Sequence, residues 1–220
     1  MKKTLLALVF ISLASSAHSA GFSLENISSK DIGLNAAAVP APVLAAPAKE
    51  ATQVPADLVN RFNQVKNDLW RLESDTTWLR SDMDRLESTA RRIAQMNSSD
   101  PFFQNDLQRM SFDMSRYAND AQRISADIKG LLNLAQKDAG LNAIARDIDM
   151  DARTLLNRAQ FDIENSAQRL EWAVRSAKPE LIGYNAQWQA MDISRYSRDF
   201  TWKVRDISYD AQNLVSQTQP

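Results

Sequence analysis

The sequence predicts an all-α protein: an elongated antiparallel up-down-up-down four-helix bundle with coiled-coil-like packing. Two observations predict this fold. Beyond residue 55 the apolar residues recur at alternating steps of four and three, which is the heptad repeat of packed helices. Breaks containing Pro, Gly, Ser and Asp divide this part of the chain into four segments of nearly equal length. A signal peptide and a disordered Ala/Pro-rich linker are expected to precede the bundle.

Residues 1–20 are expected to be a signal peptide. Lys2 and Lys3 give a basic start, "TLLALVFISLA" is an apolar run, and "SSAHSA" supplies small residues for cleavage. The apolar run is shorter than the about 20 residues that a membrane-spanning helix needs. We therefore expect a secreted protein, periplasmic in a Gram-negative host, with no transmembrane segment once the signal is removed.

Loss of the signal would remove a whole class of chemistry. The single histidine, His18, lies inside it, and the chain has 0 cysteines. Acid–base or nucleophilic chemistry by His or Cys, disulfides, and nitrogen or sulfur metal sites are then excluded. Losing the charges of Lys2 and Lys3 takes the net charge from −1 to −3, which does not favour binding to nucleic acid. We expect no cofactor, no metal site and no nucleic-acid partner.

Residues 21–54 are expected to be a flexible N-terminal segment. Residues 21–35 show no sustained apolar period and are interpreted as disordered or as a short docking strand. Proline then fixes its own backbone angle and biases the preceding residue toward extended conformations, so the next stretch is predicted to be a semi-stiff linker. A Pro-rich ligand for a partner is the alternative. This stretch is residues 36–56, and its prolines are Pro40, Pro42, Pro47 and Pro55.

The boundaries of the helices follow from backbone chemistry. Asp100 is expected to cap the second helix before Pro101, Gly140 to stop it with Asn142 capping the third, and Pro179 to begin the fourth. The expected bundle spans residues 55–217, with helices over about 56–97, 101–138, 143–177 and 179–216.

Short connections predict that sequential helices are antiparallel neighbours. The competing arrangement fuses the second and third helices into one longer helix in a chain that dimerises, and Gly140 argues against it. Gly183 is expected inside the fourth helix, where it costs about 1 kcal/mol relative to Ala.

The apolar stripe is most regular in the first segment, where Thr76 fills its one polar gap. The third segment is looser, because steps of four follow one another through Ala159, Ile163 and Ala167. A longer period relaxes the left-handed supercoil, so we expect relaxed supercoiling there. The first stripe consists of Leu58, Phe62, Val65, Leu69, Leu72, Leu79, Met83, Leu86, Ala90 and Ile93.

A charged pattern accompanies the stripes of the first, second and fourth segments. An Asp recurs every seven residues and is followed three positions later by Arg, Trp or Tyr. We predict a structural ladder of semi-buried Asp–Arg contacts between helices, with Arg planes stacking on Trp78 or Trp202 of another helix. The alternative is a solvated charged face. The residues of the ladder are Asp68, Arg71, Asp82, Arg85, Asp106, Arg109, Asp113, Arg116, Asp120, Arg123, Asp192 and Arg195.

Few residues point to chemistry. The stretch "DIDMDA" at residues 147–152 lacks the sixth-position Gly and the final acid of a calcium loop, and no nucleophile motif or Gly-rich phosphate loop occurs. We expect no catalytic residue. The tryptophans are the candidate contacts with a partner, because exposed aromatics mark binding surfaces. They are Trp70, Trp78, Trp172, Trp188 and Trp202.

The predicted function is therefore that of a non-enzymatic, secreted helical-bundle protein, an interaction scaffold or spacer in the cell envelope. Its expected partner is a protein of unknown identity, and self-association is open. The alternative is a chaperone-like or apolar-ligand-binding module, for which Met83, Met110 and Met114 would make an adaptable core. A hydrolase without His or Cys, which would use paired carboxylates, is a distant alternative.

Overall fold

The computed structural model describes residues 54–220, and the expected signal peptide and nearly all of the expected linker lie outside the described residues. Every regular element of the described part is a helix, so the all-α class is confirmed. The elements are α1 (Ala56–Met96), α2 (Phe103–Leu132), α3 (Ala139–Arg158), the π-helical turn η1 (Ala159–Ile163), α4 (Glu164–Ser176), α5 (Pro179–Ile182) and α6 (Ala186–Thr218).

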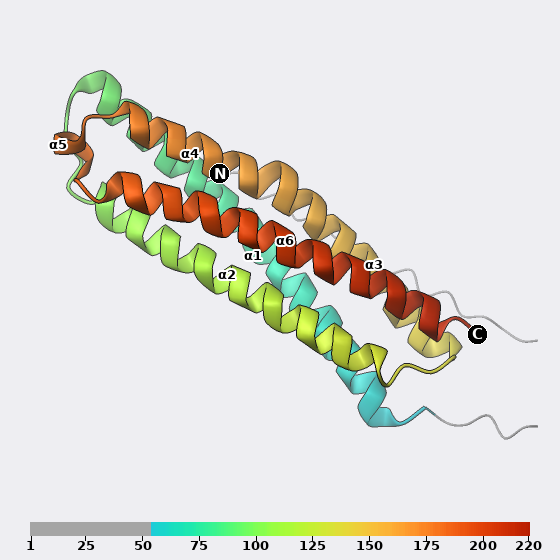
Figure 1. Cartoon of the computed structure of the whole chain (residues 1–220). Helices are drawn as coiled ribbons and strands as arrows, with labels where there is room; N and C mark the ends of the chain where they lie inside the picture. The colour runs from blue at the N-terminus through green and yellow to red at the C-terminus, as the bar shows by residue number, and fades with distance from the viewer. Residues whose placement is uncertain (1–53) are drawn as a thin grey trace, which may run out of the picture. The chain divides into compact units, whose positions relative to one another are not determined.

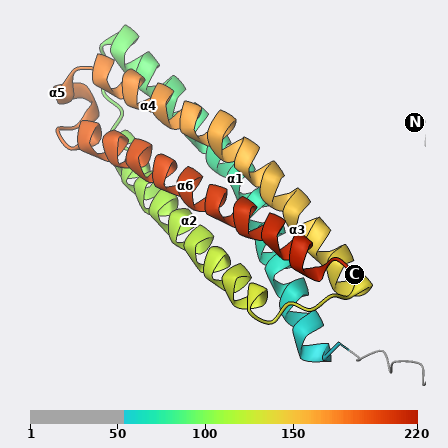
Figure 2. The ribbon, with the colours of Figure 1, turned by 45° about the vertical axis from the view of Figure 1, so that its right-hand side comes forward.

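Five of these helices pack lengthwise against one another as a helical bundle (Figures 1 and 2). α3, η1 and α4 follow each other without a break and form one helical line. α1 packs against α2 and against this line, and α6 packs against the same two neighbours. The link from α1 to α2 lies at the end of the bundle where α5 lies, and the start of α3 lies at the opposite end beside the C-terminus (Figure 1).

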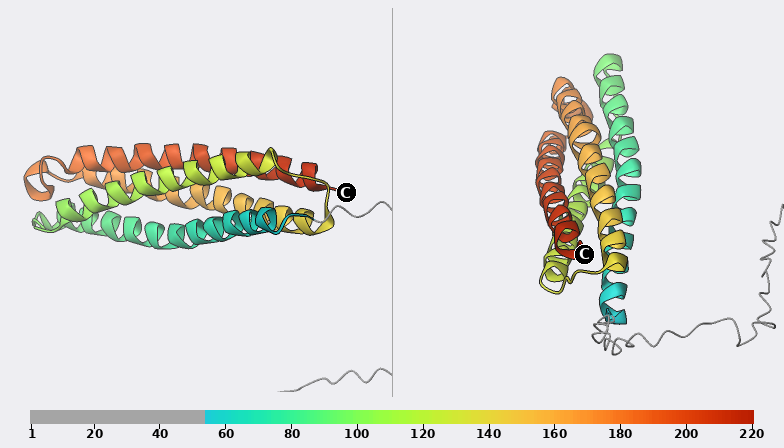
Figure 3. Two further views of the ribbon diagram at one scale, coloured as in Figure 1. Left: turned by 90° about the horizontal axis from the view of Figure 1, so that it is seen from below. Right: turned by 90° about the vertical axis from the view of Figure 1, so that its right-hand side faces the viewer.

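The order of the helices around the bundle differs from the expected one. α2 and the α3–α4 line both pack against α1 and α6 and lie diagonally across from each other. The α2–α3 link therefore crosses the end of the bundle, as Figure 3 shows. Six residues, 133–138, can span about 20 Å, whereas helices packed 8–10 Å apart have a diagonal of about 14 Å. Sequential helices thus need not be neighbours.

This arrangement brings parallel helices together. Lys66 Nζ lies 2.6 Å from Asp147 Oδ2 near one end of α1, and Lys178 Nζ donates to Asn97 Oδ1 at 2.9 Å at the other end. Residue numbers increase together in these pairs, so α1 runs parallel to the α3–α4 line. The colour gradient of Figure 1 shows the same direction for both.

The predicted core of α1 is confirmed. Every apolar residue of its stripe is buried, and Thr76 is buried at the polar gap. The Thr76 hydroxyl donates to the Glu73 carbonyl oxygen at 2.6 Å, which provides the partner that a buried hydroxyl needs. The same periodicity places Ala135, Ile144 and Tyr196 in the apolar stripes of the later segments, but these three residues are only half-buried.

The link between α2 and α3 differs from its prediction. α2 ends at Leu132, and α3 begins at Ala139, because Asp138 rather than Asn142 is the capping residue. Asp138 Oδ1 accepts a hydrogen bond of 2.9 Å from the Leu141 backbone N–H. Asn142 is buried in the first turns of α3 and donates through Nδ2 to the Val215 carbonyl oxygen at 3.0 Å. Its side chain thereby ties α3 to the end of α6.

Gly183 does not lie inside a long fourth helix. Its φ of 92° ends the short α5, and α6 begins three residues later at Ala186. A Cβ at this position would lie 2.1 Å from Gln104 Oε1 of α2. The position therefore requires glycine for its backbone angle, and any larger residue would also displace the flexible side chain of Gln104.

Candidate interaction surfaces

The predicted charged ladder falls into two parts, and the first joins α1 to α2. Arg123 donates to Asp68 Oδ2 at 3.0 Å, and Arg85 donates to Asp106 Oδ2 at 3.2 Å. From the first pair to the second, the residue number rises by 17 on α1, from Asp68 to Arg85, and falls by 17 on α2, from Arg123 to Asp106. An antiparallel register requires this. The same register places Arg71 opposite Asp120, and these two line a cavity of about 90 Å³ with Asp68 and Arg123.

This α1–α2 seam is the set of residues that the antiparallel register sets opposite one another. The register also sets Asp75 opposite Arg116, Trp78 opposite Asp113 and Asp82 opposite Arg109, but within residues 54–220 no ion pair crosses the seam at these positions. Ion pairs across the seam between half-exposed side chains contribute only about 0.2–1 kcal/mol each. The seam consequently aligns the two helices more than it stabilises them.

The second part of the ladder stays within single helices. Asp113 lies 3.8 Å from Arg109 and 3.5 Å from Arg116, all on α2. Arg195 lies 3.1 Å from Asp192 on α6. Pairs three or four residues apart on one helix contribute about 0.2–0.5 kcal/mol, so these residues do not connect helices.

The expected stacking of arginine on a tryptophan of another helix is not found in residues 54–220. Trp78 is 74% exposed, and Trp202 is 62% exposed. The guanidinium that lies over the Trp202 ring belongs to Arg205 of the same helix, 4.6 Å from the ring centroid. Neither ring therefore fills space between helices.

The tryptophans instead face solvent. All five are at least 62% exposed, although an aromatic of this size usually buries most of its surface. They are distributed over the outer faces of three elements: Trp70 and Trp78 on α1, Trp172 on α4, and Trp188 and Trp202 on α6. Other large apolar side chains are exposed as well: Phe112, Met150, Phe161, Tyr184, Met191 and Tyr209 among them.

A second ladder, between α1 and the α3–α4 line, was not predicted from the sequence. Arg80 lies 2.8 Å from Asp162, and Arg169 lies 2.8 Å from Asp84 and 3.0 Å from Glu87. Partners are 81 to 85 residues apart along the chain, so no local pattern reveals them. The one signal is the repeated offset, which is recognisable only once α1 and α3 are known to be parallel neighbours. The complete set is Lys66–Asp147, Glu73–Arg158, Arg80–Asp162, Asp84–Arg169 and Glu87–Arg169.

Hydrogen bonding and burial shift the pKa of several groups in these ladders and the core. The hydrogen bond from Lys66 to Asp147 raises the pKa of that lysine above its usual value. Burial raises the pKa of Asp210, whose carboxylate lies 3.7 Å from Lys129 Nζ. Burial also raises the pKa of Asp151, and the negative charge of Glu73 adds to the shift. Asp210 and Asp151 lie on α6 and α3 respectively, and the charge of a lysine lowers the pKa of each, Lys129 for Asp210 and Lys66 for Asp151, without cancelling the rise.

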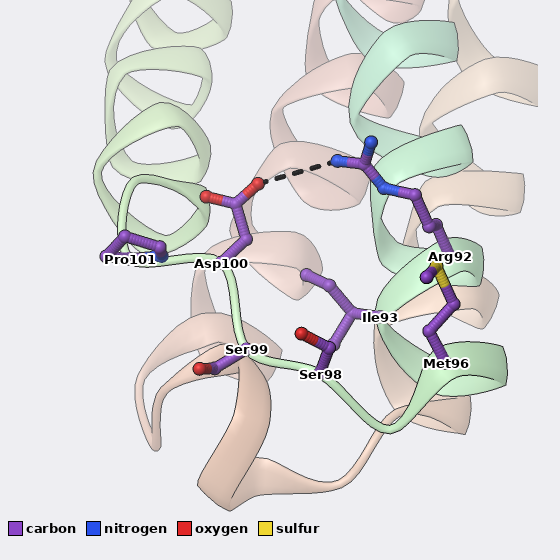
Figure 4. Close-up of a pocket in the computed structure, with 7 residues that line it drawn as sticks. All are labelled: Arg92, Ile93, Met96, Ser98, Ser99, Asp100 and Pro101. Atoms are coloured by element: carbon purple, nitrogen blue, oxygen red, sulfur yellow. Dashed lines mark ion pairs between the residues drawn. The ribbon is translucent and has the colours of Figure 1, made fainter.

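A surface cavity of about 410 Å³ lies at the α1–α2 link (Figure 4). Arg92 and Asp100 face each other across it at 3.6 Å, with Met96 and the hydroxyls of Ser98 and Ser99 around them. Among residues 54–220, no group of His, Asp or Glu side chains is placed to hold a metal ion.

No helix in the described part of the chain is both long enough and apolar enough to cross a membrane. Comparison with known proteins gave no matching family model, no matching curated protein and no matching solved structure. The described part of the chain is an all-α helical bundle with two interhelical charge ladders and exposed tryptophans.

Proposed function

We propose that this protein is a non-enzymatic interaction scaffold or spacer, secreted to the cell envelope. In this proposal α1, α2, the α3–α4 line and α6 are the four rods of an up-down-up-down bundle with coiled-coil-like packing. A signal peptide over residues 1–20 directs its export, and residues 21–54 join the bundle to whatever holds it in place.

The observation that carries the proposal is the exposure of all five tryptophans on the outer faces of the bundle. Leaving a large aromatic side chain in water forgoes about 1.5–3 kcal/mol of burial free energy. Tryptophan, tyrosine and arginine are the residues that dominate the energetics of protein interfaces. A protein partner that buries Trp70, Trp78 or Trp172 would account for their positions.

Site-specific photocrosslinking in native cells tests this function. A crosslinkable residue replaces Trp70 or Trp172 in one set of strains and the exposed polar residues Gln108 or Asn119 of α2 in a matched set. We expect one discrete adduct at the tryptophan positions and none at the α2 positions. Binding of the purified adduct partner should then weaken at least about tenfold with Trp70→Ala or Trp172→Ala. Equal adducts at all four positions would refute a specific surface.

Export is tested separately by fractionating the cells and determining the N-terminus of the product by mass spectrometry. The proposal requires a product outside the cytoplasm that starts near residue 18 to 21. An uncleaved chain recovered from the cytoplasm would contradict it.

A chaperone-like or apolar-ligand-binding module is the second candidate function. The methionines Met83, Met110 and Met114 lie in the core, each at most 4% exposed, and flexible thioethers can repack around a guest. Binding of an apolar dye by the native protein, together with suppressed aggregation of an unfolded client, would favour this candidate. A cooperative thermal transition without dye binding would favour the scaffold.

A further inference from the structure

The outer face of α6 carries a second heptad stripe, opposite the one in the core. Its members alternate in steps of three and four over 21 residues, a length of about 32 Å, and every one of them is exposed. Four of its seven members are aromatic or methionine and three are arginine, and these residue types are enriched in protein interfaces. We name it the outer stripe of α6, and it consists of Trp188, Met191, Arg195, Arg198, Trp202, Arg205 and Tyr209.

Charges of opposite sign lie on the two shoulders of this stripe. Asp192, Asp199 and Asp206 follow one another at seven-residue steps along the shoulder toward α2, each one position after a stripe residue. Arg198 and Arg205 lean toward the other shoulder, because helical geometry turns each successive residue by about 100°. The stripe therefore has an aromatic centre, an acidic edge and a basic edge.

Few of these charges have strong partners within the bundle. No ion pair involves Arg198, Arg205 or Asp206 in the part of the chain that the structure describes, where Arg198 donates only to the Ser194 hydroxyl. Arg195 pairs with Asp192 on its own helix, and Asp199 pairs likewise with Lys203. Such exposed pairs within one helix contribute about 0.3–0.5 kcal/mol and can exchange partners readily.

We propose that the outer stripe of α6 is a self-association surface, on which α6 of a second copy of this chain packs in parallel. Met191, Arg198 and Arg205 occupy the d positions of the stripe. In a parallel pair each d residue packs beside the residue that follows the equivalent d residue of the partner. Arg198 then lies beside Asp199 of the partner subunit, and Arg205 lies beside Asp206 of the partner subunit. Trp188, Trp202 and Tyr209 stack against their own counterparts along the two-fold axis. Arg195, Arg198 and Arg205 also face their own counterparts, so the charges of Arg198 and Arg205 depend on the flanking aspartates for balance, and Arg195 keeps its pair with Asp192 of its own helix.

Charge selects both the occupant and its direction. An antiparallel copy would set the acidic edge against the acidic edge and the basic edge against the basic edge, and like charges brought together across an interface are repelled. A parallel copy brings Arg198 and Arg205 of each subunit beside the acidic edge of the other, so each of these two layers holds two arginines and two aspartates and is neutral overall. An acidic helix from another protein would pair with the arginines but would be repelled by Asp192, Asp199 and Asp206.

The expected dimer is reversible. A standard interface buries about 800 Å² of each partner, and a single helix seam of about 32 Å covers less than that. The proposal is independent of the proposed function, because Trp70 on α1 and Trp172 on α4 lie on other elements and stay free for a heterologous partner.

Sedimentation equilibrium of the purified protein tests the association through charge reversal. An acidic variant carries Arg198→Glu with Arg205→Glu, and a basic variant carries Asp199→Arg with Asp206→Arg. We expect each variant alone to self-associate at least about tenfold more weakly than the wild type, because two repulsive contacts replace two attractive ones. A one-to-one mixture of the two variants should recover association, since every contact across the mixed pair is again between opposite charges.

The control is Arg146→Glu, which reverses an exposed arginine on α3 and should leave self-association unchanged. Circular dichroism spectra and thermal midpoints establish that all variants remain folded. A wild type that is monomeric at every accessible concentration would overturn the proposal, as would a variant mixture that associates no better than its components.

Disulfide trapping tests the direction of the pair, and the absence of native cysteine makes it clean. Met191→Cys and Tyr209→Cys are each prepared as a single-cysteine protein, and Phe112→Cys on the exposed face of α2 is the matched control. In a parallel pair each of the two α6 variants should form a disulfide with its own kind in oxidising buffer, since the Cα atoms approach within about 6 Å. Crosslinking only between the Met191→Cys and Tyr209→Cys proteins would show an antiparallel pair and refute the proposal.

Discussion

The hydroxyl of Thr201 in α6 shares its proton between two carbonyl oxygens: that of Ser197 in its own helix, at 3.0 Å, and that of Ala159, the first residue of η1, at 3.3 Å. The Ala159 oxygen also accepts the backbone N–H of Glu164, five residues later in the chain. A π-helical turn holds one more residue than an α-helical turn. The consecutive steps of four in the apolar stripe of the third segment are therefore accommodated by this one π-helical turn. Relaxed supercoiling was the expectation from the sequence. Thr201 of α6 contacts the carbonyl oxygen at which the turn begins.

Removal of one residue from η1 should be tolerated. Deleting Gln160 would shorten the step from Ala159 to Ile163 to three residues, which restores an alternation of four and three from Ile148 to Val174. The stripe beyond the deletion keeps its face toward the core because the π turn already absorbs the extra residue. We expect the free energy of unfolding in urea to change by less than about 1 kcal/mol.

The matched control is deletion of Gln168 from the regular helix α4. That deletion rotates every residue between it and Ala177 by about 100° and turns Leu170 and Val174 away from the core. We expect a loss of more than about 3 kcal/mol or a failure to fold. Equal destabilisation by the two deletions would show that η1 does not hold a surplus residue.

Two glycines in the bundle should respond to alanine with opposite signs. Gly183→Ala should destabilise the fold by about 1–3 kcal/mol, because its φ is 92° and the new Cβ would overlap Gln104. Gly130→Ala should stabilise it by up to about 1 kcal/mol, because α2 is regular there and the nearest atom, Arg61 Nη2, would be 3.7 Å from the new Cβ. Thermal and urea unfolding of both variants measure the difference, and a stabilising Gly183→Ala would contradict the structure.

Periodicity in the sequence is enough to predict the class of the fold and the buried face of α1, down to the polar Thr76. It does not predict which helices are neighbours, because a link of six residues can reach either an adjacent or a diagonal position. The pairs Arg80–Asp162 and Arg169–Glu87 depend on that choice. The Asp–Arg repeat indicates contact between α1 and α2. The same spacing in α6 gives an ion pair only within that helix, because the helix that packs beside an Asp–Arg repeat, and not the spacing itself, determines whether the ion pairs join two helices.

The α1–α2 seam should show coupling that the intrahelical pairs lack. In a double-mutant cycle Asp68→Ala and Arg123→Ala should couple by about 0.5–1 kcal/mol, because the 3.0 Å hydrogen bond joins two helices and Asp68 is largely covered. Asp113→Ala and Arg116→Ala, 3.5 Å apart on α2, should couple by about 0.2–0.5 kcal/mol. Cycles of either α2 residue against Trp78→Ala should give a value near zero. Equal coupling for all pairs would mean that the seam does not distinguish contacts between helices from contacts within one.

The carboxyl group of Asp210 should make stability depend on pH. Burial raises its pKa above the ordinary value, the like charge of Asp206 raises it further, and Lys129 and Ser125 of α2 lower it, with a net rise. Folding therefore favours the protonated form. This contribution to stability is fully present below the unfolded pKa of about 3.9 and is lost as pH rises through the higher folded pKa.

Asp210→Asn keeps the shape of the side chain but carries no charge at any pH. Its free energy of unfolding relative to the wild type should rise as pH increases from 4 to 7, by up to about 1 kcal/mol, in urea titrations at a series of pH values. Asp57→Asn, which removes an exposed carboxylate at the start of α1, controls for the change in net charge. A difference between Asp210→Asn and wild type that stays constant or shrinks as pH rises would show that Lys129 compensates fully for the burial of this carboxylate.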